Sequence, residues 1–181
     1  MRQAFFILSF LFLACFSIVL TVTANSWKTF KNEKNRYTIT YPTSWHLLDD
    51  TIDTLTIVNF PPDRRVKGVV MPPSGAGITV VPAPPGIAGI SAWEEKDLLG
   101  STPLNRQRIS AKGRTTGACS QLVQTEWESE EGPDTYSHQT AYYCASGNRL
   151  YRVELSNWRG NPNQTQLQKT ALRMVLSLRS W

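Results

Sequence analysis

Residues 117–155 read GACSQLVQTEWESEEGPDTYSHQTAYYCASGNRLYRVEL, and this stretch decides the fold. Polar and apolar side chains alternate along it, which is typical of strands with one buried face. Two turn signals divide it: the segment Gly132-Pro133-Asp134, and the pair Gly147-Asn148, which suits a type II′ hairpin. The stretch therefore predicts three consecutive antiparallel strands, at 118–127, 136–145 and 150–155.

The two turns also predict how these strands are aligned. A first hairpin that is symmetric about its loop places three pairs opposite one another: Cys119 with Cys144, Val123 with Thr140, and Trp127 with Tyr136. The second turn aligns Cys144 with Tyr151, Tyr142 with Val153, and Thr140 with Leu155. Because successive side chains point to opposite faces, one face is expected to be the core. It carries Cys119, Val123, Trp127, Tyr136, Tyr142, Cys144, Tyr151, Val153 and Leu155. The other face is expected to be solvated, apart from Leu122 and Tyr143; it carries Ser120, Gln124, Glu126, Ser137, Gln139, Arg152 and Glu154.

The same alignment predicts a disulfide between Cys119 and Cys144. Directly opposed antiparallel residues lie about 4.5 to 5.5 Å apart at Cα, within the range that a disulfide tolerates. Neither cysteine belongs to a CxxC motif, so the bond is expected to be structural and not catalytic. The alternative is two buried free thiols.

Residues 1–24 have the pattern of a secretory signal peptide. A positive charge at Arg2 precedes an apolar run, residues 4–22, and small residues favour cleavage after Ala24. Two other interpretations stay open: lipidation at Cys15, or an uncleaved anchor, since the run is about long enough to span a bilayer. All three export the domain. We therefore expect a periplasmic or secreted protein, either free or tethered to the membrane.

Residues 25–181 have the length of a single domain with its own core. The formal net charge of the chain, +5, is mildly basic and does not by itself indicate a nucleic-acid partner. Asp49, Asp50 and Asp53 lack the regular spacing of a calcium loop, so a solvated turn is the better interpretation. We predict a monomer with no cofactor, no metal and no nucleic-acid partner.

The rest of the sequence predicts further strands and two helices. Strand signals occur at 37–41, 45–48, 55–60, 78–81 and 104–111. Ser91 as N-cap and Glu94 in a capping box predict a short helix that ends near Gly100. An amphipathic helix is predicted from an N-cap at Asn161 to about Arg179. Its apolar stripe, which we expect to cover the sheet, consists of Leu167, Ala171, Met174, Val175 and Leu178.

Two groups of basic residues are candidates for a partner-binding surface. The first group is Arg64, Arg65 and Lys67, within a Pro- and Gly-rich segment from 61 to 89. The second group is Arg106, Arg108, Lys112 and Arg114. If the fold brought them together, they would suit membrane headgroups or an acidic partner. The alternative is a set of solvated loops and a strand edge protected by charge.

The sequence carries no catalytic signature. It has no Gly-x-Ser-x-Gly elbow, no His-Glu-x-x-His zinc motif and no phosphate-binding loop motif. His46 lies in an apolar strand, and His138 is predicted opposite Thr125 with no nucleophile nearby in sequence. We therefore assign no catalytic residue and do not expect an enzyme.

The segment Tyr37-x-Ile39-x-Tyr41-Pro42-x-x-Trp45, the strands that end at Leu155, and a final helix that closes with Ser177-Leu178-Arg179 frame nearly all of residues 25–181. Together they resemble the PsbP-like superfamily, which includes extrinsic photosystem proteins, DcrB-like bacterial envelope proteins and a Ran-binding relative. The resemblance implies an α+β fold, an antiparallel sheet flanked by helices in an α/β/α sandwich, and an accessory or binding role without catalysis. It transfers no functional residue to this sequence.

Three roles follow as hypotheses. The first is an exported, non-enzymatic accessory protein that binds a protein or envelope component, with membrane-surface association as one form, through the loops of 61–89 and nearby basic residues. The second is a carrier of a small molecule or lipid, with a pocket between the sheet and the C-terminal helix. The third is a hydrolase with an unrecognised site.

Overall fold

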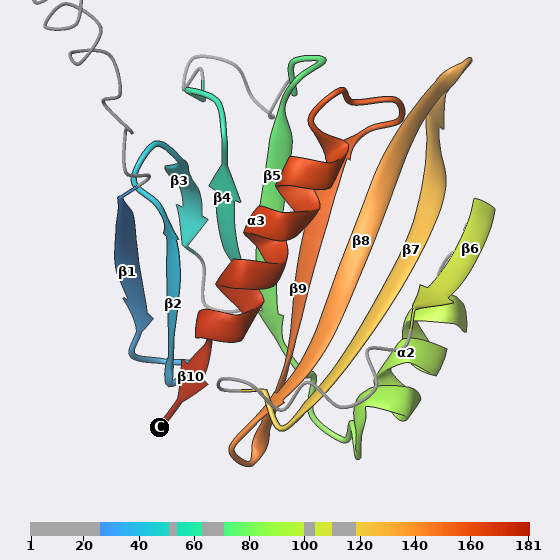
Figure 1. Ribbon diagram of the computed structural model, residues 1–181. Coiled ribbons are helices and arrows are strands. Elements are labelled where there is room, and N and C mark those ends of the chain that lie inside the picture. Colours follow the sequence, from blue (N-terminus) through green and yellow to red (C-terminus); the bar gives the residue numbers. More distant parts are fainter. Residues whose placement is uncertain (1–25, 51–53, 63–70, 100–103, 110–118) are drawn as a thin grey trace, which may run out of the picture.

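The computed structural model describes residues 26–50, 54–62, 71–99, 104–109 and 119–181. Over these ranges the chain forms a mostly antiparallel α+β fold (Figure 1), as predicted. The strands are β1 (Trp27–Asn32), β2 (Tyr37–Pro42), β3 (His46–Asp50), β4 (Leu55–Val58), β5 (Ala76–Pro82), β6 (Leu104–Ile109), β7 (Gln121–Gly132), β8 (Thr135–Ser146), β9 (Arg149–Trp158) and β10 (Arg179–Ser180). The helices are α2 (Ile90–Leu99) and α3 (Gln164–Ser177). Neither of these helices is long and apolar enough to cross a bilayer.

The predicted leader, residues 1–24, lies outside the described residues, and so does its candidate lipidation site Cys15. Cleavage, lipidation and retention of the leader all remain predictions.

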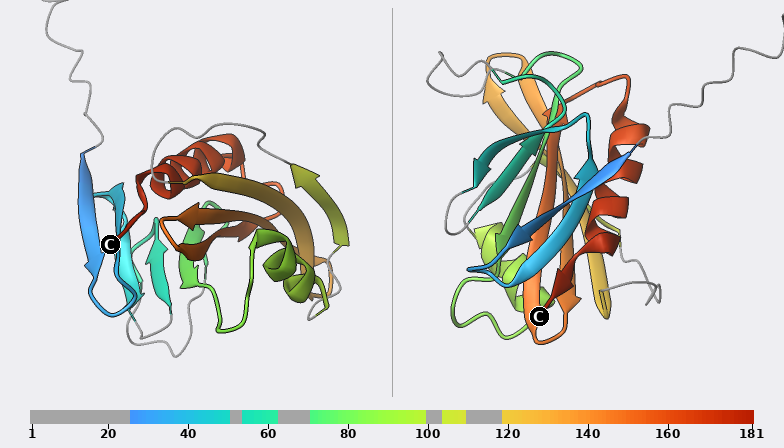
Figure 2. Two further views of the ribbon diagram at one scale, coloured as in Figure 1. Left: turned by 90° about the horizontal axis from the view of Figure 1, so that it is seen from below. Right: turned by 90° about the vertical axis from the view of Figure 1, so that its left-hand side faces the viewer.

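The strands form two sheets. The large sheet has the order β3-β4-β5-β9-β8-β7-β6, and the small sheet has the order β1-β2-β10. Figure 2 shows α3 and α2 on opposite sides of the large sheet, so the predicted sandwich of helix, sheet and helix is present. The small sheet stands at one side of α3, and its third strand comes from the end of the chain.

The main core lies between α3 and the two sheets. The predicted apolar stripe of α3 is buried there, with Ala171, Met174, Val175 and Leu178 at 0% exposure and Leu167 at 5%. The small sheet contributes Tyr37, Ile39 and Tyr41 to the same cluster. The Ser177 hydroxyl also accepts a hydrogen bond from the Thr40 backbone N–H at 2.8 Å. The C-terminal helix therefore joins the two sheets.

The alignment of β8 with β9 is as predicted, including Cys144 opposite Tyr151. Gly147 has φ +58°, which fits the first central position of a type II′ turn.

The predicted alignment of β7 with β8 is wrong by three residues. Cys144 lies opposite Leu122 instead of Cys119, Val123 opposite Tyr143 instead of Thr140, and Trp127 opposite Gln139 instead of Tyr136. His138 accordingly lies opposite Glu128 and not Thr125. The difference arises because the hairpin closes tightly at Pro133 and Asp134, with Gly132 opposite Thr135 and an irregularity between Glu130 and Gly132. Asp134 has φ +55°, as the second central residue of a type II turn requires.

A shift by an odd number exchanges the faces of β7. Val123 and Trp127 therefore pack against the second face of the sheet, whereas Leu122 belongs to the main core. That second face is not solvated as predicted. Ile90 and Trp93 of α2 cover it and pack with Val123, Ala141 and Tyr143 in a second apolar cluster.

Both helices start at other residues than predicted. α2 begins at Ile90, and the Trp93 N–H donates to the Gly89 carbonyl at 3.1 Å, so Ser91 is not the N-cap. Glu94 is buried and accepts a hydrogen bond from the Thr125 hydroxyl at 2.7 Å instead of forming a capping box. At α3 the N-cap is Asn163, while Asn161 donates from Nδ2 to the Gly75 carbonyl at 3.1 Å.

Candidate binding groove

A groove lies along the flank of α3, between the helix and the small sheet. Its volume is about 420 Å³, which is within the range of pockets that hold small ligands. Its apolar lining consists of Trp27, Pro42, Trp45 and Leu167. The uncharged polar residues are Ser44, Asn59, Asn163, Gln166 and Thr170. The charged ones are Lys169 and Arg173, and no acidic residue is among the described residues of the lining.

The wall opposite α3 is a tight turn after β2. The Trp45 N–H donates to the Pro42 carbonyl at 3.0 Å. Lys28 of β1 donates from Nζ to the Trp45 carbonyl at 3.2 Å, so the turn is tied to its neighbouring strand. The Trp45 side chain is only 7% exposed and packs into the main core. The wall therefore has a fixed shape.

Arg173 and Trp27 both line the groove and contact each other. The guanidinium carbon of Arg173 lies 4.0 Å from the centre of the Trp27 ring, a cation–π contact. The stacked face of a guanidinium leaves its N–H edges available to acceptors. The Trp27 Nε1 atom is buried and has no hydrogen-bond partner among the described residues.

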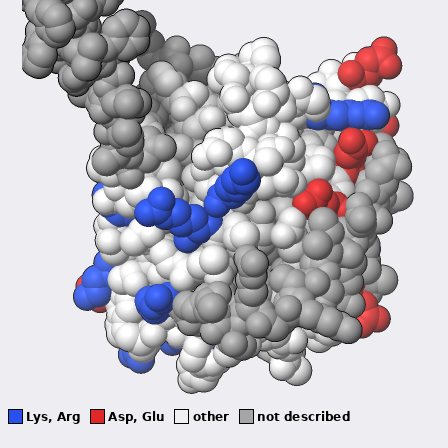
Figure 3. All heavy atoms as spheres, viewed as in Figure 1, with Lys and Arg blue, Asp and Glu red and all other residues white. Residues whose placement is uncertain are grey.

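The two cations of the groove have no carboxylate partner among the described residues, although other cations do. Lys31 lies 2.6 Å from Glu33, and Arg159 lies 3.3 Å from Glu128. Lys169 and Arg173 are four residues apart on α3, so their side chains are neighbours. In Figure 3 blue atoms gather over α3 and the small sheet, whereas red atoms gather on the side of β7. The groove therefore lies in the basic part of this face.

A second polar cluster lies on the opposite side of the large sheet, beneath α2. Arg152 of β9 donates from Nη1 to Oδ2 of Asp97, which also accepts a hydrogen bond from the Tyr143 hydroxyl at 2.9 Å. Arg152 Nε lies 3.4 Å from Oε2 of Glu154. Burial raises the pKa of Glu154, and Arg152 only partly opposes this. The cluster joins α2 to β9 and is best explained as structural.

The raised pKa of Glu154 predicts a pH dependence of stability. When the pKa of a carboxyl is higher in the folded than in the unfolded protein, the protein loses stability as pH rises above the pKa of the unfolded state. For Glu154 that pKa is near 4.5. Glu154→Gln removes this titration. We therefore expect the stability of the variant relative to wild type to increase between pH 4 and pH 7 in urea unfolding. A pH-independent difference would contradict the assignment.

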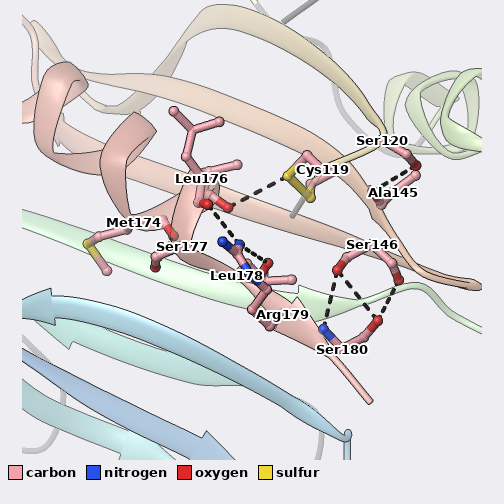
Figure 4. The surroundings of a disulfide bond; sticks show 12 residues. Cys119, Ser120, Ala145, Ser146, Met174, Leu176, Ser177, Leu178, Arg179 and Ser180 are labelled. Atoms are coloured by element: carbon pink, nitrogen blue, oxygen red, sulfur yellow. Dashed lines mark hydrogen bonds between the residues drawn. A yellow bond between two sulfur atoms is a disulfide. The ribbon is translucent and has the colours of Figure 1, made fainter. Parts of the chain in front are cut away.

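The predicted cysteine pair lies at disulfide distance in the structure, although the residues are not directly opposed. The Cys119 and Cys144 Sγ atoms are 1.99 Å apart, and the Cα atoms are 5.4 Å apart. Cys119 precedes β7, and the Ser120 N–H donates to the Ala145 carbonyl at 2.8 Å, which brings this segment alongside β8. Figure 4 shows the bond beside the end of α3, where the Cys119 sulfur lies 3.6 Å from the Val175 carbonyl.

The structure does not test whether the sequence-predicted binding residues lie close together. Arg64, Arg65 and Lys67 lie outside the described ranges, as do Lys112 and Arg114. Arg106 and Arg108 lie in β6, the edge strand next to β7. The structure describes the backbone of this strand but not the side chains of these two residues. β4 and β5, which flank the first group, are separated from β6 by at least β9, β8 and β7. This surface stays a prediction.

Parts of the Pro- and Gly-rich segment have clear structural roles. Trp158 donates from Nε1 to the Met71 carbonyl at 2.8 Å, and the Gly75 N–H donates to the Pro72 carbonyl at 2.7 Å. Ala83 and Ile87 pack against the cluster beneath α2. These residues attach the segment to the large sheet.

The buried cluster between α3 and the large sheet contains Leu167, Ala171, Met174 and Val175 of the helix. A carrier pocket at this interface stays a prediction, and the groove described above lies beside the helix. His46 is exposed at the edge strand β3, and His138 Nε2 lies 3.6 Å from Oε2 of Glu126. Over the described ranges, no three His, Cys, Asp or Glu residues are grouped so that they could hold a metal ion.

No family model matches this sequence. No curated protein matches it either.

Solved structures share the fold. A protein from Bacteroides thetaiotaomicron matches with a TM-score of 0.53 and 12% identity over 85% of this chain. The match covers 48% of that protein, so the present chain spans about half its length. The Ran-binding protein Mog1p of Saccharomyces cerevisiae matches with a TM-score of 0.52 and 9% identity, over 87% of this chain and 96% of Mog1p. Cyanobacterial PsbP from Synechocystis sp. PCC 6803 gives a TM-score of 0.46 and 12% identity, over 90% and 96% of the two chains.

Identities this low show a shared fold and nothing about function. The match to Mog1p extends over most of both chains. The chain therefore has the α+β fold that its sequence predicts.

Proposed function

We propose that this protein is an exported, non-enzymatic accessory protein that binds a partner protein or envelope component in the groove beside α3. The observation that carries the proposal is the groove itself, with tryptophans in its lining, amides and hydroxyls along it and two cations on one wall. Aromatic surface with a few convergent polar groups is typical of binding sites. Export rests on the signal-peptide pattern and is consistent with a cysteine pair at disulfide distance.

A substitution that fills the groove tests this proposal. Thr170 lines the groove, whereas Thr165 lies on the same helix outside its lining. Thr170→Tyr should block a partner, while Thr165→Tyr is the matched control. The measurement is cross-linking in intact cells, followed by purification and mass spectrometry. We expect partners captured by wild type and Thr165→Tyr to be lost with Thr170→Tyr. Equal capture by all three proteins would exclude the groove.

The same experiment also tests the surface that the sequence predicts, formed by the loops of 61–89 and nearby basic residues. A variant with Arg64, Arg65 and Lys67 neutralised should retain its partners if the groove binds them. Loss of partners from this variant alone would assign binding to the loops. Analysis of the N-terminus of the purified protein tests export and distinguishes cleavage after Ala24 from lipidation at Cys15 or retention.

A further inference from the structure

The charges of the groove specify its ligand more closely. Lys169 and Arg173 are the only charged residues of α3, and both line the groove. Like charges four residues apart on a helix repel each other. No described carboxylate offsets this repulsion. An anionic group placed between the two side chains would do so, and it would gain two charge-assisted hydrogen bonds.

Arg173 is held in a position that favours binding of an anionic group. Its contact with Trp27 at 4.0 Å restricts the guanidinium. Less conformational freedom is then lost when a ligand binds. A stacked guanidinium offers its N–H edge to a carboxylate in a bidentate geometry.

The rest of the lining suits a peptide. The side-chain amides of Asn163 and Gln166 can donate to and accept from a peptide backbone. The amide of Asn59 already accepts from the Ala76 N–H at 2.7 Å and donates to the Ser74 carbonyl at 3.5 Å. Trp27, which is only partly buried, provides apolar surface in the same lining. The hollow of about 420 Å³ accepts protruding side chains, whereas a bilayer surface would meet only its rim. These features favour a protein segment over a membrane.

We propose that the groove binds an acidic segment of a partner protein, with Asp or Glu side chains between Lys169 and Arg173 and an apolar neighbour against Trp27. The inference rests on the proposed function, because it names the chemistry of the partner for the same groove. Complementary charge is its basis: the described lining is basic and contains no acid.

The test is unbiased selection of peptides. A library of random decapeptides is panned against the protein purified from the envelope fraction of cells that express the full chain. The selected peptides are then measured by fluorescence anisotropy, each beside its analogue with Glu and Asp replaced by Gln and Asn. Vesicles of phosphatidylglycerol and of phosphatidylcholine are measured in parallel.

Three variants assign any binding to the groove. Lys169→Gln with Arg173→Gln removes both cations, and Lys169→Gln alone leaves the contact of Arg173 with Trp27 intact in case the double variant is unstable. Lys34→Gln with Lys96→Gln is the control, because it removes the same charge from exposed positions outside the lining. Thermal unfolding checks that each variant is folded.

We expect selected peptides to be enriched in Asp and Glu. Their affinity should fall by on the order of 10-fold with Lys169→Gln and further with the double variant, as loss of charge-assisted hydrogen bonds implies. Replacing Glu and Asp of the peptides by Gln and Asn should lower their affinity for the wild-type protein at least as much. The control variant should bind the acidic peptides like wild type. Affinity should also fall as salt rises.

Absence of acidic enrichment, or equal affinity of acidic and neutral peptides, would overturn the inference. If neutral peptides are selected and Thr170→Tyr abolishes their binding, the groove still binds a partner and only its acidic character is wrong. If no selected peptide responds to Thr170→Tyr, the proposed function fails as well. Binding of phosphatidylglycerol vesicles that depends on both cations, without acidic peptides, would assign the groove to lipid headgroups.

Discussion

Replacing both Cys119 and Cys144 with alanine is expected to lower the free energy of unfolding by about 3 kcal/mol. The disulfide closes a loop between residues 25 apart in sequence, and its absence lets the unfolded chain gain conformational freedom. Cys144 is fully buried and Cys119 nearly so, and both belong to the main core. Guanidinium unfolding measures the change, and wild type unfolded in reductant should resemble the double variant.

The presence of the bond in the purified protein is checked separately. Intact mass after alkylation under denaturing conditions should show no modified thiol at Cys119 or Cys144 until the protein has been reduced. Two alkylated thiols without reduction would show that the pair is not joined, and would remove the reason for the stability difference.

Leu155→Ala should cost about as much stability, on the order of 3 kcal/mol, for a different reason. Leu155 is completely buried in β9, opposite Thr140 of β8 and Ile78 of β5. Truncation removes buried apolar surface and leaves a cavity. The neighbouring strands and helices cannot easily move to fill it. Thermal unfolding should show a midpoint lower by roughly 10 °C.

Leu47→Ala is the matched control for this substitution. Leu47 lies in the edge strand β3 and is 37% exposed. The same deletion of atoms should therefore have a much smaller effect there. A similar loss at both positions would mean that the core of the large sheet is not where the structure places it.

The sequence predicts local elements well because their signals are local. The apolar stripe of α3 and the turn at Gly147 depend on neighbouring residues, and both are where they were expected. The sequence predicts the β7–β8 turn too, but the alignment of the two strands depends on how many residues the turn contains. A two-residue turn with an irregularity at its base moved β7 by three positions.

The second layer also has a signal in the sequence. Leu122 and Tyr143 are apolar residues on the face that the sequence predicts to be solvated. With β7 correctly aligned, Val123, Trp127 and Tyr143 form an apolar surface that α2 covers with Trp93. A helix between two strands needs such a surface, because its own apolar residues must be buried.

The groove could not be predicted, because it is assembled from segments far apart in sequence. Trp27, Trp45 and Arg173 meet only once the small sheet is packed beside α3. The pairing of β2 with β10 joins residues separated by about 140 positions, and no local pattern encodes it. One hint was present: the only charges on α3 are positive and lie four residues apart.

That pairing of β2 with β10 has a consequence for biogenesis. β1 and β2 are among the first strands to be made, but their sheet has no third strand until Arg179 and Ser180 reach Tyr37 and Thr38. Contacts between such distant residues form slowly, because a long loop must close first. A nascent chain therefore keeps its N-terminal strands without their last partner until synthesis has passed residue 180. Until then the small sheet consists of the β1–β2 pair alone.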